Sequence, residues 1–423
     1  MSVKETARAV RSAYLKLSAL SGERRAAALL RMADALERER ESVLAANRAD
    51  MEAASKIAPA VRARLRFDEK KLAGCVEGLR ALAALPDRVG AKLAETELAP
   101  GLVLEKVACP IGVIGIIFEA RPDALVQIAS LCLKSGNGAL LKGGSEAQRT
   151  NRALYEVIYR ASVEAGCPEG WLALLETRAD VSEMLAEDET IDLLIPRGSN
   201  EFVRYIMDNS HIPVMGHADG ICHLYLDAAA DAARAVAVAV DSKCQYMAAC
   251  NACETLLVHE AAAETVLPAV AAALREKGIT LYGCERAQEI LGCAPPPFGW
   301  AHEYLGPELS VRVVSDLERA VEHINTYGSG HTDAIVTEDR AAAERFLDAV
   351  DSADVFWNCS TRFADGFRFG FGAEVGISTS KIHARGPVGL EGLMIYKYKL
   401  RGSGDTVAPF AGGERSFTHK KRM

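Results

Sequence analysis

The chain has 423 residues, a formal net charge of −8 at pH 7, 49% hydrophobic residues and 25% charged residues. This length allows two or three domains with large cores, and the composition is ordinary for a globular protein. The acidic balance argues against binding to nucleic acid or to a membrane surface. We expect a cytoplasmic protein with free thiols, because the eleven cysteines are scattered, the N-terminus lacks a signal-peptide core, and no apolar run is long enough to span a membrane.

The first quarter of the chain predicts helices followed by a hairpin. In residues 2–54 apolar side chains recur at helical spacing, and Ser2 and Glu5 have the spacing of a capping box. Two short apolar runs then flank the turn dipeptide Pro100-Gly101, which is typical of a hairpin. The edge of such a hairpin is a plausible place for pairing between subunits.

After the hairpin, apolar runs alternate with helical stretches. The predicted strands are 111–118, 139–141, 172–175, 191–195 and 221–226, then 254–258, 311–314, 333–337 and 354–358. Strands that alternate with helices predict βαβ units and a mostly parallel sheet, so the fold class is α/β. We place a domain boundary near residues 227–235. A cleft between two α/β domains is a usual place for a small-molecule site.

Cys250 is the most informative residue of the chain. It lies between an alanine-rich helical run and an apolar run that predicts a strand. A thiolate in such a loop can attack an activated acyl carbon and form a thioester, if oxyanion donors lie beside it. The alternative is a small buried residue, which is what most cysteines are.

Cys250 and Cys253 also form a Cys-x-x-Cys, which is compatible with a redox pair or with half a zinc site. No second Cys-x-x-Cys or close pair of histidines completes a metal set, so we predict no metal. The nine histidines show no metal spacing, and we expect each to be structural or solvent-facing.

Two strand ends are candidates for binding a nucleotide. Arg197, Gly198 and Ser199 close a predicted strand and open a helix, where free N–H groups and the helix dipole suit a pyrophosphate. A simple helix N-cap at Ser199 explains the same pattern equally well. Lys142 and Gly143 end another strand, and Lys142 could reach a ribose or an adenosine phosphate, or lie in solvent.

Two arginines are candidates for anionic groups of a substrate. Arg121 follows a buried strand and precedes Pro122 at a helix start, so it points toward the carboxyl edge of the sheet. It suits a phosphate or a carboxylate, although a salt bridge near the helix is the simpler alternative. Arg362 lies in a glycine-dense stretch, residues 358–392, and is a candidate for a substrate carboxylate.

Together these motifs resemble the aldehyde dehydrogenase superfamily, and within it the family of gamma-glutamyl phosphate reductases. The resemblance covers nearly the whole chain, and the order of its motifs is specific although each one alone is weak. The matching stretches are residues 110–115, 118–122, 134–138, 141–144, 195–198, 220–223, 250–252, 328–333 and 384–392.

The resemblance implies an aldehyde-dehydrogenase-like fold. Residues 1–234 would form N-terminal helices and a Rossmann-type NADP(H)-binding domain, with the hairpin at about 94–108. Residues 235–376 would form the α/β catalytic domain, and 377–423 would return to the cofactor domain and add an oligomerisation tail. The implied assembly is a homodimer or homotetramer.

The implied reaction is the NADPH-dependent reduction of L-glutamate 5-phosphate to L-glutamate 5-semialdehyde, with release of phosphate, in proline biosynthesis. Glutamate 5-kinase is then a candidate partner. The choice of NADPH over NADH rests on the resemblance alone, since no residue is a clear clamp for a 2′-phosphate.

The resemblance also implies roles for individual residues. Cys250 is the nucleophile, Glu303 holds the nicotinamide ribose, Lys142 with Gly143 lies at the adenosine ribose, and the segment Arg197-Gly198-Ser199 lies at the pyrophosphate. Oxidative members of the superfamily carry a glutamate that activates water against the thioester. The corresponding segment, residues 213–220, contains no glutamate, so the thioester should persist long enough to accept hydride.

The remaining roles are less direct. The oxyanion asparagine of the superfamily is replaced in the segment 118–121, so we expect the Cys250 N–H and Asn251 to be the donors. Arg121 and Lys243 are candidates for the leaving phosphate, and Arg362 for the substrate carboxylate. Three alternatives stay open: a CoA-acylating aldehyde dehydrogenase, a thiol-redox protein that uses Cys250 and Cys253, and a non-catalytic NADP-binding subunit.

Overall fold

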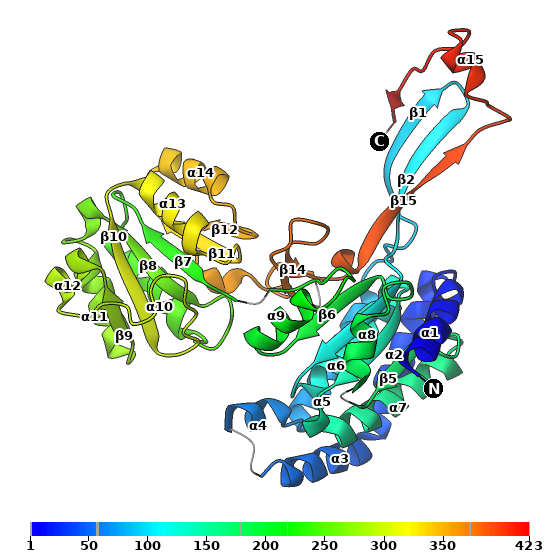
Figure 1. Ribbon diagram of the computed structural model, residues 1–423, viewed down its shortest axis with the longest axis horizontal. Helices are drawn as coiled ribbons and strands as arrows, with labels where there is room; N and C mark the ends of the chain where they lie inside the picture. Colours follow the sequence, from blue (N-terminus) through cyan, green and yellow to red (C-terminus); the bar gives the residue numbers. More distant parts are fainter. Residues whose placement is uncertain (1, 56–58, 178, 218, 372–373, 423) are drawn as a thin grey trace. The chain divides into compact units, whose positions relative to one another are not determined.

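The computed structural model describes residues 2–55, 59–177, 179–217, 219–371 and 374–422. The chain forms two compact units, each with its own sheet (Figure 1). Unit 1 contains residues 1–215, 371–375 and 388–423, and unit 2 contains residues 216–370 and 376–387. Among the described helices, none combines the length and the apolar character that crossing a membrane requires.

The central sheet of unit 1 has four parallel strands in the order β5-β4-β3-β6. The strands are β3 (Val113–Phe118), β4 (Gly138–Gly143), β5 (Leu172–Leu175) and β6 (Leu193–Arg197). Every residue of β3 and β4 is buried, as expected for central strands covered on both faces. The chain runs from β3 outward through β4 to β5 and then returns to β6 on the other side of β3. The strand order therefore reverses between β3 and β6.

Helices cover this sheet on both sides (Figure 1). The capping box predicted at Ser2 and Glu5 is confirmed and begins the first helix. Apolar side chains of that helix, among them Val3 and Val10, pack with Leu140 of β4 in one buried cluster. The helices of unit 1 are α1 (Val3–Leu17), α2 (Gly22–Arg38), α3 (Arg40–Ala53), α4 (Pro59–Leu65), α5 (Glu69–Ala84), α6 (Pro122–Ser135), α7 (Gln148–Glu164), α8 (Ala179–Leu185) and α9 (Asn200–Asp208).

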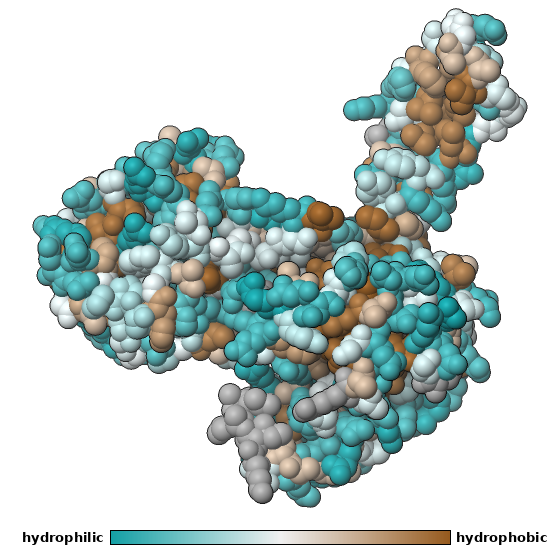
Figure 2. Space-filling model, viewed as in Figure 1, coloured by the Kyte–Doolittle hydropathy of each residue, from teal (hydrophilic) through white to brown (hydrophobic). Residues whose placement is uncertain are grey.

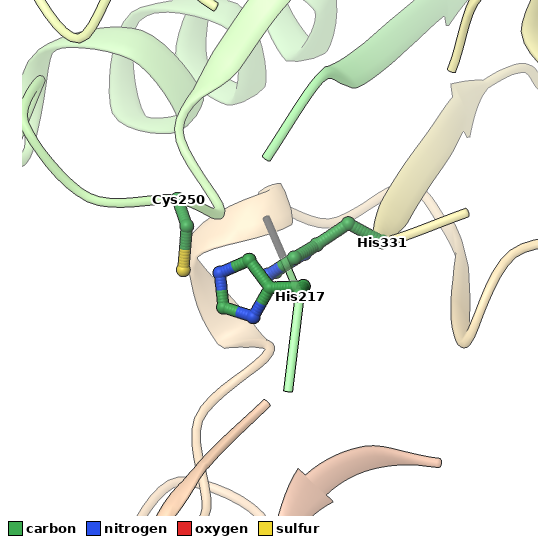
Figure 3. Close-up of side chains that lie close together, drawn as sticks. All are labelled: His217, Cys250 and His331. Atoms are coloured by element: carbon green, nitrogen blue, oxygen red, sulfur yellow. The ribbon is translucent and has the colours of Figure 1, made fainter. Parts of the chain in front are cut away.

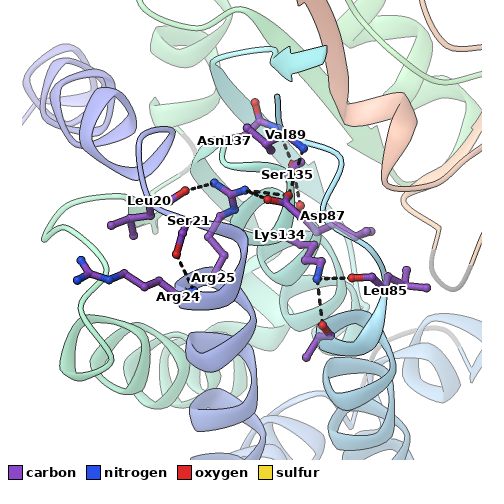
Figure 4. Close-up of polar contacts among 12 residues, drawn as sticks. Leu20, Ser21, Arg24, Arg25, Leu85, Asp87, Val89, Lys134, Ser135 and Asn137 are labelled. Atoms are coloured by element: carbon purple, nitrogen blue, oxygen red, sulfur yellow. Dashed lines mark hydrogen bonds and ion pairs between the residues drawn. The ribbon is translucent and has the colours of Figure 1, made fainter. Parts of the chain in front are cut away.

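Polar contacts tie α2 and α6 to the segment that follows α5 (Figure 4). Arg25 is almost fully buried, and its guanidinium donates to the Leu20 carbonyl and to both carboxylate oxygens of Asp87. Lys134 donates to the carbonyl oxygen of Leu85 at 2.7 Å. Asn137 accepts a hydrogen bond from the Gly112 N–H. The motif at 134–138 therefore serves to hold backbone together within unit 1.

A second, antiparallel sheet of unit 1 has the order β15-β2-β1-β16. Its strands are β1 (Lys92–Ala99), β2 (Leu102–Pro110), β15 (Met394–Arg401) and β16 (Lys420–Lys421), and the short helix α15 (Ala408–Ala411) precedes the last of them. The predicted hairpin is confirmed, and Gly101 takes the positive φ of 81° that its turn requires. Strand β15 is an edge strand of this sheet and is exposed at seven of its eight residues.

Unit 2 contains six parallel strands in the order β12-β11-β7-β8-β10-β9. The strands are β7 (Cys222–Leu226), β8 (Cys253–His259), β9 (Thr280–Gly283), β10 (Glu308–Val314), β11 (Thr332–Val336) and β12 (Asp354–Trp357). The helices are α10 (Ala232–Cys244), α11 (Leu267–Glu276), α12 (Glu285–Leu291), α13 (Leu317–Tyr327) and α14 (Arg340–Ala349).

The strands of unit 2 send alternate side chains into two separate cores. Leu224 and Leu256 belong to a cluster shared with α10 and α11. Their chain neighbours Tyr225 and Leu257 belong to a second cluster, shared with α13 and α14. The sheet is therefore buried on both faces, which explains why its strands are apolar runs without polar alternation.

The division of the chain differs from the prediction at both boundaries. Strand β7 pairs with β8 and β11, so residues 216–234 belong to unit 2 rather than to the predicted 1–234 domain. Residues 376–387 belong to unit 2, whereas the prediction places 377–423 in the cofactor domain. The chain therefore passes between the two units more often than predicted. Apolar runs alone do not reveal which sheet a strand joins.

Several short elements complete the two units. They are β13 (Gly376–Ser378), which pairs with β14 (Gly386–Val388), and the 3₁₀ turns η1 (Ser145–Ala147), η2 (Glu260–Ala262), η3 (Thr361–Phe363) and η4 (Glu391–Leu393). The sequence did not predict the short strands β9, β13 and β14, nor the eight-residue edge strand β15, which is exposed at seven of its residues.

Candidate active site

The predicted cofactor residues of unit 1 gather at the carboxyl edge of its parallel sheet. Phe118, the last residue of β3, pairs with Gly143 of β4 on one side and with Arg197 of β6 on the other. Arg121 follows β3 as the N-cap residue of α6. The edge thus includes the point between β3 and β6 where the strand order reverses, which is the usual ligand site of open α/β sheets.

The N-terminus of α9 already holds a carboxylate of the protein itself. Ser199 caps the helix by accepting a hydrogen bond from the Phe202 N–H, so the N-cap alternative is confirmed. The Ser199 N–H donates to Oε2 of Glu119 at 3.1 Å, and a Cβ added to Gly198 would lie 2.5 Å from the same oxygen. Sequence analysis did not single out Glu119, although its carboxylate occupies the place expected for a phosphate.

Lys142 and Gly143 have close neighbours within unit 1. Lys142 is only 5% exposed, and its ammonium group donates to the Gly143 carbonyl. A Cβ at position 143 would lie 2.2 Å from the Asn151 amide nitrogen, so glycine is required there by packing. Ala120 adopts a positive φ of 40°, which is uncommon for alanine, and its N–H donates to Glu146. That turn sets where Arg121 enters α6.

In unit 2 the candidate residues lie at the opposite, amino edge of the sheet. Cys250 is half-buried in the loop between α10 and β8. His331 immediately precedes β11, and Gly220 lies just before β7. Because β11, β7 and β8 are neighbours in the sheet, the segments that precede them meet beside the thiol.

Gly220 lies against the backbone of Cys250. A Cβ at position 220 would be 2.0 Å from the Cys250 carbonyl oxygen, so no other residue fits without a shift of backbone. The Gly220 N–H donates to Oε1 of Glu303 at 2.9 Å. Glu303, the glutamate predicted to hold the nicotinamide ribose, is therefore bonded to the segment that packs against the backbone of Cys250.

Two histidines lie together beside the Cys250 thiol (Figure 3). The Sγ of Cys250 and one ring nitrogen each of His217 and His331 all lie within 4.8 Å of one another. The two rings pack edge to face, with centroids 4.7 Å apart. These donor types also occur in zinc sites, but a thiol beside imidazole is equally the arrangement of a cysteine nucleophile.

Sequence analysis missed both histidines, which it expected to be structural or solvent-facing. His217 lies 33 residues before Cys250 and His331 lies 81 residues after it, so no local spacing connects them. The usable signal was that each of them shortly precedes an apolar strand. That signal becomes informative only when the strands are known to be neighbours in one sheet.

The second cysteine of the Cys-x-x-Cys is a core residue. Cys253 is 1% exposed, its thiol donates to the Thr255 carbonyl, and burial raises its pKa to about 12. Such a thiol is inert, which argues against a redox pair with Cys250. Another buried thiol, that of Cys222, donates to the Cys250 carbonyl at 3.2 Å and helps to fix the loop between α10 and β8.

The other two candidates near Cys250 lie in different environments. Asn251 is 4% exposed, and its amide donates to the Ala364 carbonyl at 2.7 Å. Arg362 is half-buried and donates to the Gln245 side chain at 2.9 Å. Burial lowers the pKa of Arg362, while Cys250 acts in the opposite direction, so the guanidinium lies within electrostatic reach of the thiol.

Lys243 is not placed to bind a leaving phosphate. Its side chain is fully buried and donates to Oε2 of Glu254 at 2.7 Å, in a pair whose two side chains are both 0% exposed. Burial raises the pKa of Glu254 to about 7, against the opposing effect of Lys243. The other oxygen of Glu254 accepts the Leu305 N–H. The pair therefore supports the loop that carries Glu303. Lys243 has this structural role in place of the predicted role in binding the leaving phosphate.

The sequence matches the aldehyde dehydrogenase family over residues 1–280 and 292–396. The chain belongs to this family. It is 57% identical to the gamma-glutamyl phosphate reductase of Acetivibrio thermocellus over 100% of this chain and 98% of that protein. It is 54% identical to that of Parasynechococcus marenigrum, over 98% and 96%.

Solved structures agree with this relationship. The gamma-glutamyl phosphate reductase of Thermotoga maritima superposes with a TM-score of 0.94 at 37% identity, covering 96% of this chain and 100% of that one. An acetylating aldehyde dehydrogenase from Geobacillus thermoglucosidasius, at 16% identity, has a TM-score of 0.65 over 96% and 97% and shares the fold. The predicted aldehyde-dehydrogenase-like α/β fold is confirmed.

Family membership implies a nicotinamide cofactor and a cysteine thioester. The carboxyl edge of the sheet of unit 1 has the topology that such a cofactor needs. The amino edge of the sheet of unit 2 holds a half-buried thiol with polar groups around it. In the segment 213–220, where the hydrolytic glutamate of oxidative members is missing, the structure places His217 beside that thiol.

Proposed function

We propose that this chain is an oxidoreductase that reduces L-glutamate 5-phosphate to L-glutamate 5-semialdehyde with NADPH, releasing phosphate, in the second step of proline biosynthesis. The main support is the half-buried thiol of Cys250, which lies beside two imidazoles. In addition, the chain is 57% identical over its full length to a gamma-glutamyl phosphate reductase. An acyl phosphate is an activated acyl group, which a thiolate attacks readily.

In the proposed reaction Cys250 carries the acyl group. Its Sγ attacks the acyl carbon, the bond from that carbon to the phosphate oxygen breaks, and a thioester remains on the enzyme. Bound NADPH would supply the hydride that reduces this thioester. The resulting thiohemiacetal then expels the Cys250 thiolate and leaves the aldehyde. The backbone N–H of Cys250 and the Asn251 amide are the proposed oxyanion donors.

For the cofactor we propose the edge of unit 1 that holds Lys142, Gly143 and the segment 197–199, together with Glu303 of unit 2. The switch point between β3 and β6 fits a dinucleotide. The Ser199 N–H is bonded to Glu119, so that carboxylate has to withdraw before a pyrophosphate can accept from it. The preference for NADPH over NADH is part of the proposal, since the family itself supports only a nicotinamide cofactor.

Two arginines are proposed for the anionic ends of the substrate. Arg362 lies within electrostatic reach of Cys250 and suits the substrate carboxylate. Arg121, half-buried at the start of α6, is proposed for the phosphate. Lys243 is excluded because its ammonium group is already paired with Glu254.

We also propose a homodimer or homotetramer, formed through the antiparallel sheet of unit 1. Exposed apolar and aromatic side chains line its edge strand β15, namely Ile395, Tyr396, Tyr398 and Leu400. Figure 2 shows apolar surface on this sheet and its adjoining segments. An exposed edge strand of this kind is a template for pairing with another chain. Glutamate 5-kinase, as the source of the acyl phosphate, is the proposed partner, in the cytoplasm.

The reverse reaction tests the proposed function and avoids the labile acyl phosphate. Glutamate 5-semialdehyde, phosphate and NADP⁺ are mixed with the enzyme, and NADPH is followed by its absorbance. We expect reduction that requires both the aldehyde and phosphate. Reduction without phosphate would indicate a hydrolytic dehydrogenase, and reduction that requires CoA instead would indicate an acylating one. Either result would overturn the proposal.

A further inference from the structure

A ring nitrogen of His217 is directed at the thiol of Cys250 (Figure 3). This nitrogen lies within 4.8 Å of Sγ. The other ring nitrogen, Nδ1, lies 2.8 Å from the carbonyl oxygen of Ile377. Because a carbonyl can only accept, Nδ1 must carry a proton. In its neutral form the ring then presents the lone pair of Nε2 to the thiol, which is the tautomer that a base needs.

The ring of His331 packs edge to face against the ring of His217. It is fully buried, and its Nδ1 is 2.8 Å from the Thr332 hydroxyl. Its Nε2 is buried without a hydrogen-bond partner among the described residues. The two rings are in contact, so a positive charge on one disfavours a positive charge on the other.

Two carboxylates of unit 2 on this edge have partners of their own. Glu303 accepts the Gly220 N–H, and Glu254 is bonded to Lys243 and to the Leu305 N–H. The helix before the thiol offers no help, because α10 ends at Cys244 and its C-terminal dipole is negative. The imidazole of His217, in contrast, has a ring nitrogen within 4.8 Å of the Cys250 Sγ.

We propose that His217 is a catalytic base for Cys250. The S–H bond breaks, an Nε2–H bond forms, and the thiolate attacks the acyl carbon. When the acyl–oxygen bond breaks, the imidazolium returns the proton to the departing phosphate oxygen, which leaves as hydrogen phosphate. The thiolate released at the end of the cycle takes its proton from water. The second half of this sequence rests on the proposed function, whereas the first half concerns the thiol alone.

Alkylation of Cys250 by iodoacetamide, read by peptide mass spectrometry at pH 7 with a chelator present, tests the first half without any substrate. His217→Ala is compared with His331→Ala and with His211→Ala, which alters an exposed histidine of unit 1. We expect His217→Ala to slow alkylation and to lower turnover of the acyl phosphate by about 10²–10⁴-fold, the usual contribution of a general base. Added imidazole should restore part of both, and cofactor binding should be unchanged.

His217→Gln keeps a polar side chain of similar size and should behave as His217→Ala does, which guards against a variant that misfolds. Unchanged alkylation in both variants would overturn the proposal. So would a full loss in His331→Ala with little change in His217→Ala, because His331 would then be the base. A rise in wild-type alkylation on adding the chelator would mean that a metal ion holds the three side chains. A wild-type enzyme that is alkylated normally but turns over no acyl phosphate would contradict the proposed function and leave the base intact.

Discussion

The two parallel sheets both reverse their strand order beside their first strand, but they present their candidate sites on opposite edges. In unit 1 the chain starts at β3, moves outward through β4, and returns to β6 on the other side. In unit 2 it starts at β7, moves outward through β8, and returns to β11. The cofactor candidates follow the carboxyl ends of β3, β4 and β6, whereas Cys250 precedes the amino end of β8. The two sheets therefore place their candidate residues on different edges.

The difference has an electrostatic consequence. The carboxyl edge of a parallel sheet leads into helix N-termini, whose positive ends suit phosphates. The amino edge receives helix C-termini, whose negative ends disfavour a thiolate. A nucleophilic cysteine on that edge must obtain its activation from side chains, and the structure supplies His217, His331 and Arg362 around it. The site of unit 1 depends on backbone, and the site of unit 2 depends on side chains.

The largest expected effect is the loss of turnover when Cys250 is replaced, because this change affects the site of unit 2 and leaves the cofactor edge of unit 1 intact. Cys250→Ala should lower turnover by a factor on the order of 10⁶, as loss of a nucleophile does in a serine protease. Cofactor affinity, measured by fluorescence titration, should not change, because the edge of unit 1 is untouched. Cys253→Ala is the matched control and should keep most activity, since that thiol is buried. Loss of cofactor binding in Cys250→Ala would contradict the separation of roles.

The buried pair beneath the thiol edge predicts a pH-dependent stability. Burial raises the folded-state pKa of Glu254 to about 7 from 4.5, so the folded protein holds this proton more tightly than the unfolded chain. The contribution to the free energy of unfolding is therefore full below about pH 4.5 and falls, by about 3 kcal/mol, as pH rises to 7.

Denaturant titrations of the wild type and Glu254→Gln, followed by the fluorescence of Trp300 and Trp357 in unit 2, measure this contribution. Between pH 5 and pH 7.5 the wild type should lose stability relative to the variant. A constant difference across that range would show that the pKa of Glu254 is not raised in the folded protein, because an ordinary or lowered pKa leaves stability unchanged above about pH 5.

The smallest effect is expected at the cofactor edge. Glu119→Gln removes a negative charge from the N-terminus of α9 and should tighten NADPH binding by about 2–5-fold, since a charge at a helix terminus contributes about 0.3–1 kcal/mol. Ser199→Ala keeps Glu119 but removes the helix cap, at about 1 kcal/mol of stability. Weaker binding in Glu119→Gln would mean that the carboxylate itself contacts the cofactor.

Much of unit 1 could be read from the sequence because its signals are local. The capping box at Ser2, the hairpin at Pro100-Gly101 and the strand ends at Lys142 and Arg197 each depend on a few adjacent residues. Because ligands bind at the carboxyl ends of the strands in open α/β sheets, these strand ends are expected to lie at one site. Glu119 escaped notice because an acidic residue at a phosphate-binding edge opposes the usual charge pattern.

The site of unit 2 resisted prediction because its signals are distant. His217, Cys250 and His331 meet only through the strand order of one sheet, and the predicted boundary near 227–235 separates β7 from the strands with which it pairs. Lys243 illustrates the opposite error, since a lysine near the nucleophile looked like a phosphate ligand. Its partner Glu254 lies in a buried strand, where a charge was not expected.

A single-turnover reaction without phosphate shows whether Cys250 carries the acyl group. Enzyme is mixed with glutamate 5-semialdehyde and NADP⁺, NADPH is followed at once, and Cys250 is then examined by peptide mass spectrometry. We expect a burst of one NADPH per active site, a γ-glutamyl adduct on Cys250, and resumed turnover when phosphate is added. Sustained NADPH production without phosphate, or a burst that leaves Cys250 unmodified, would contradict acyl transfer through this thiol.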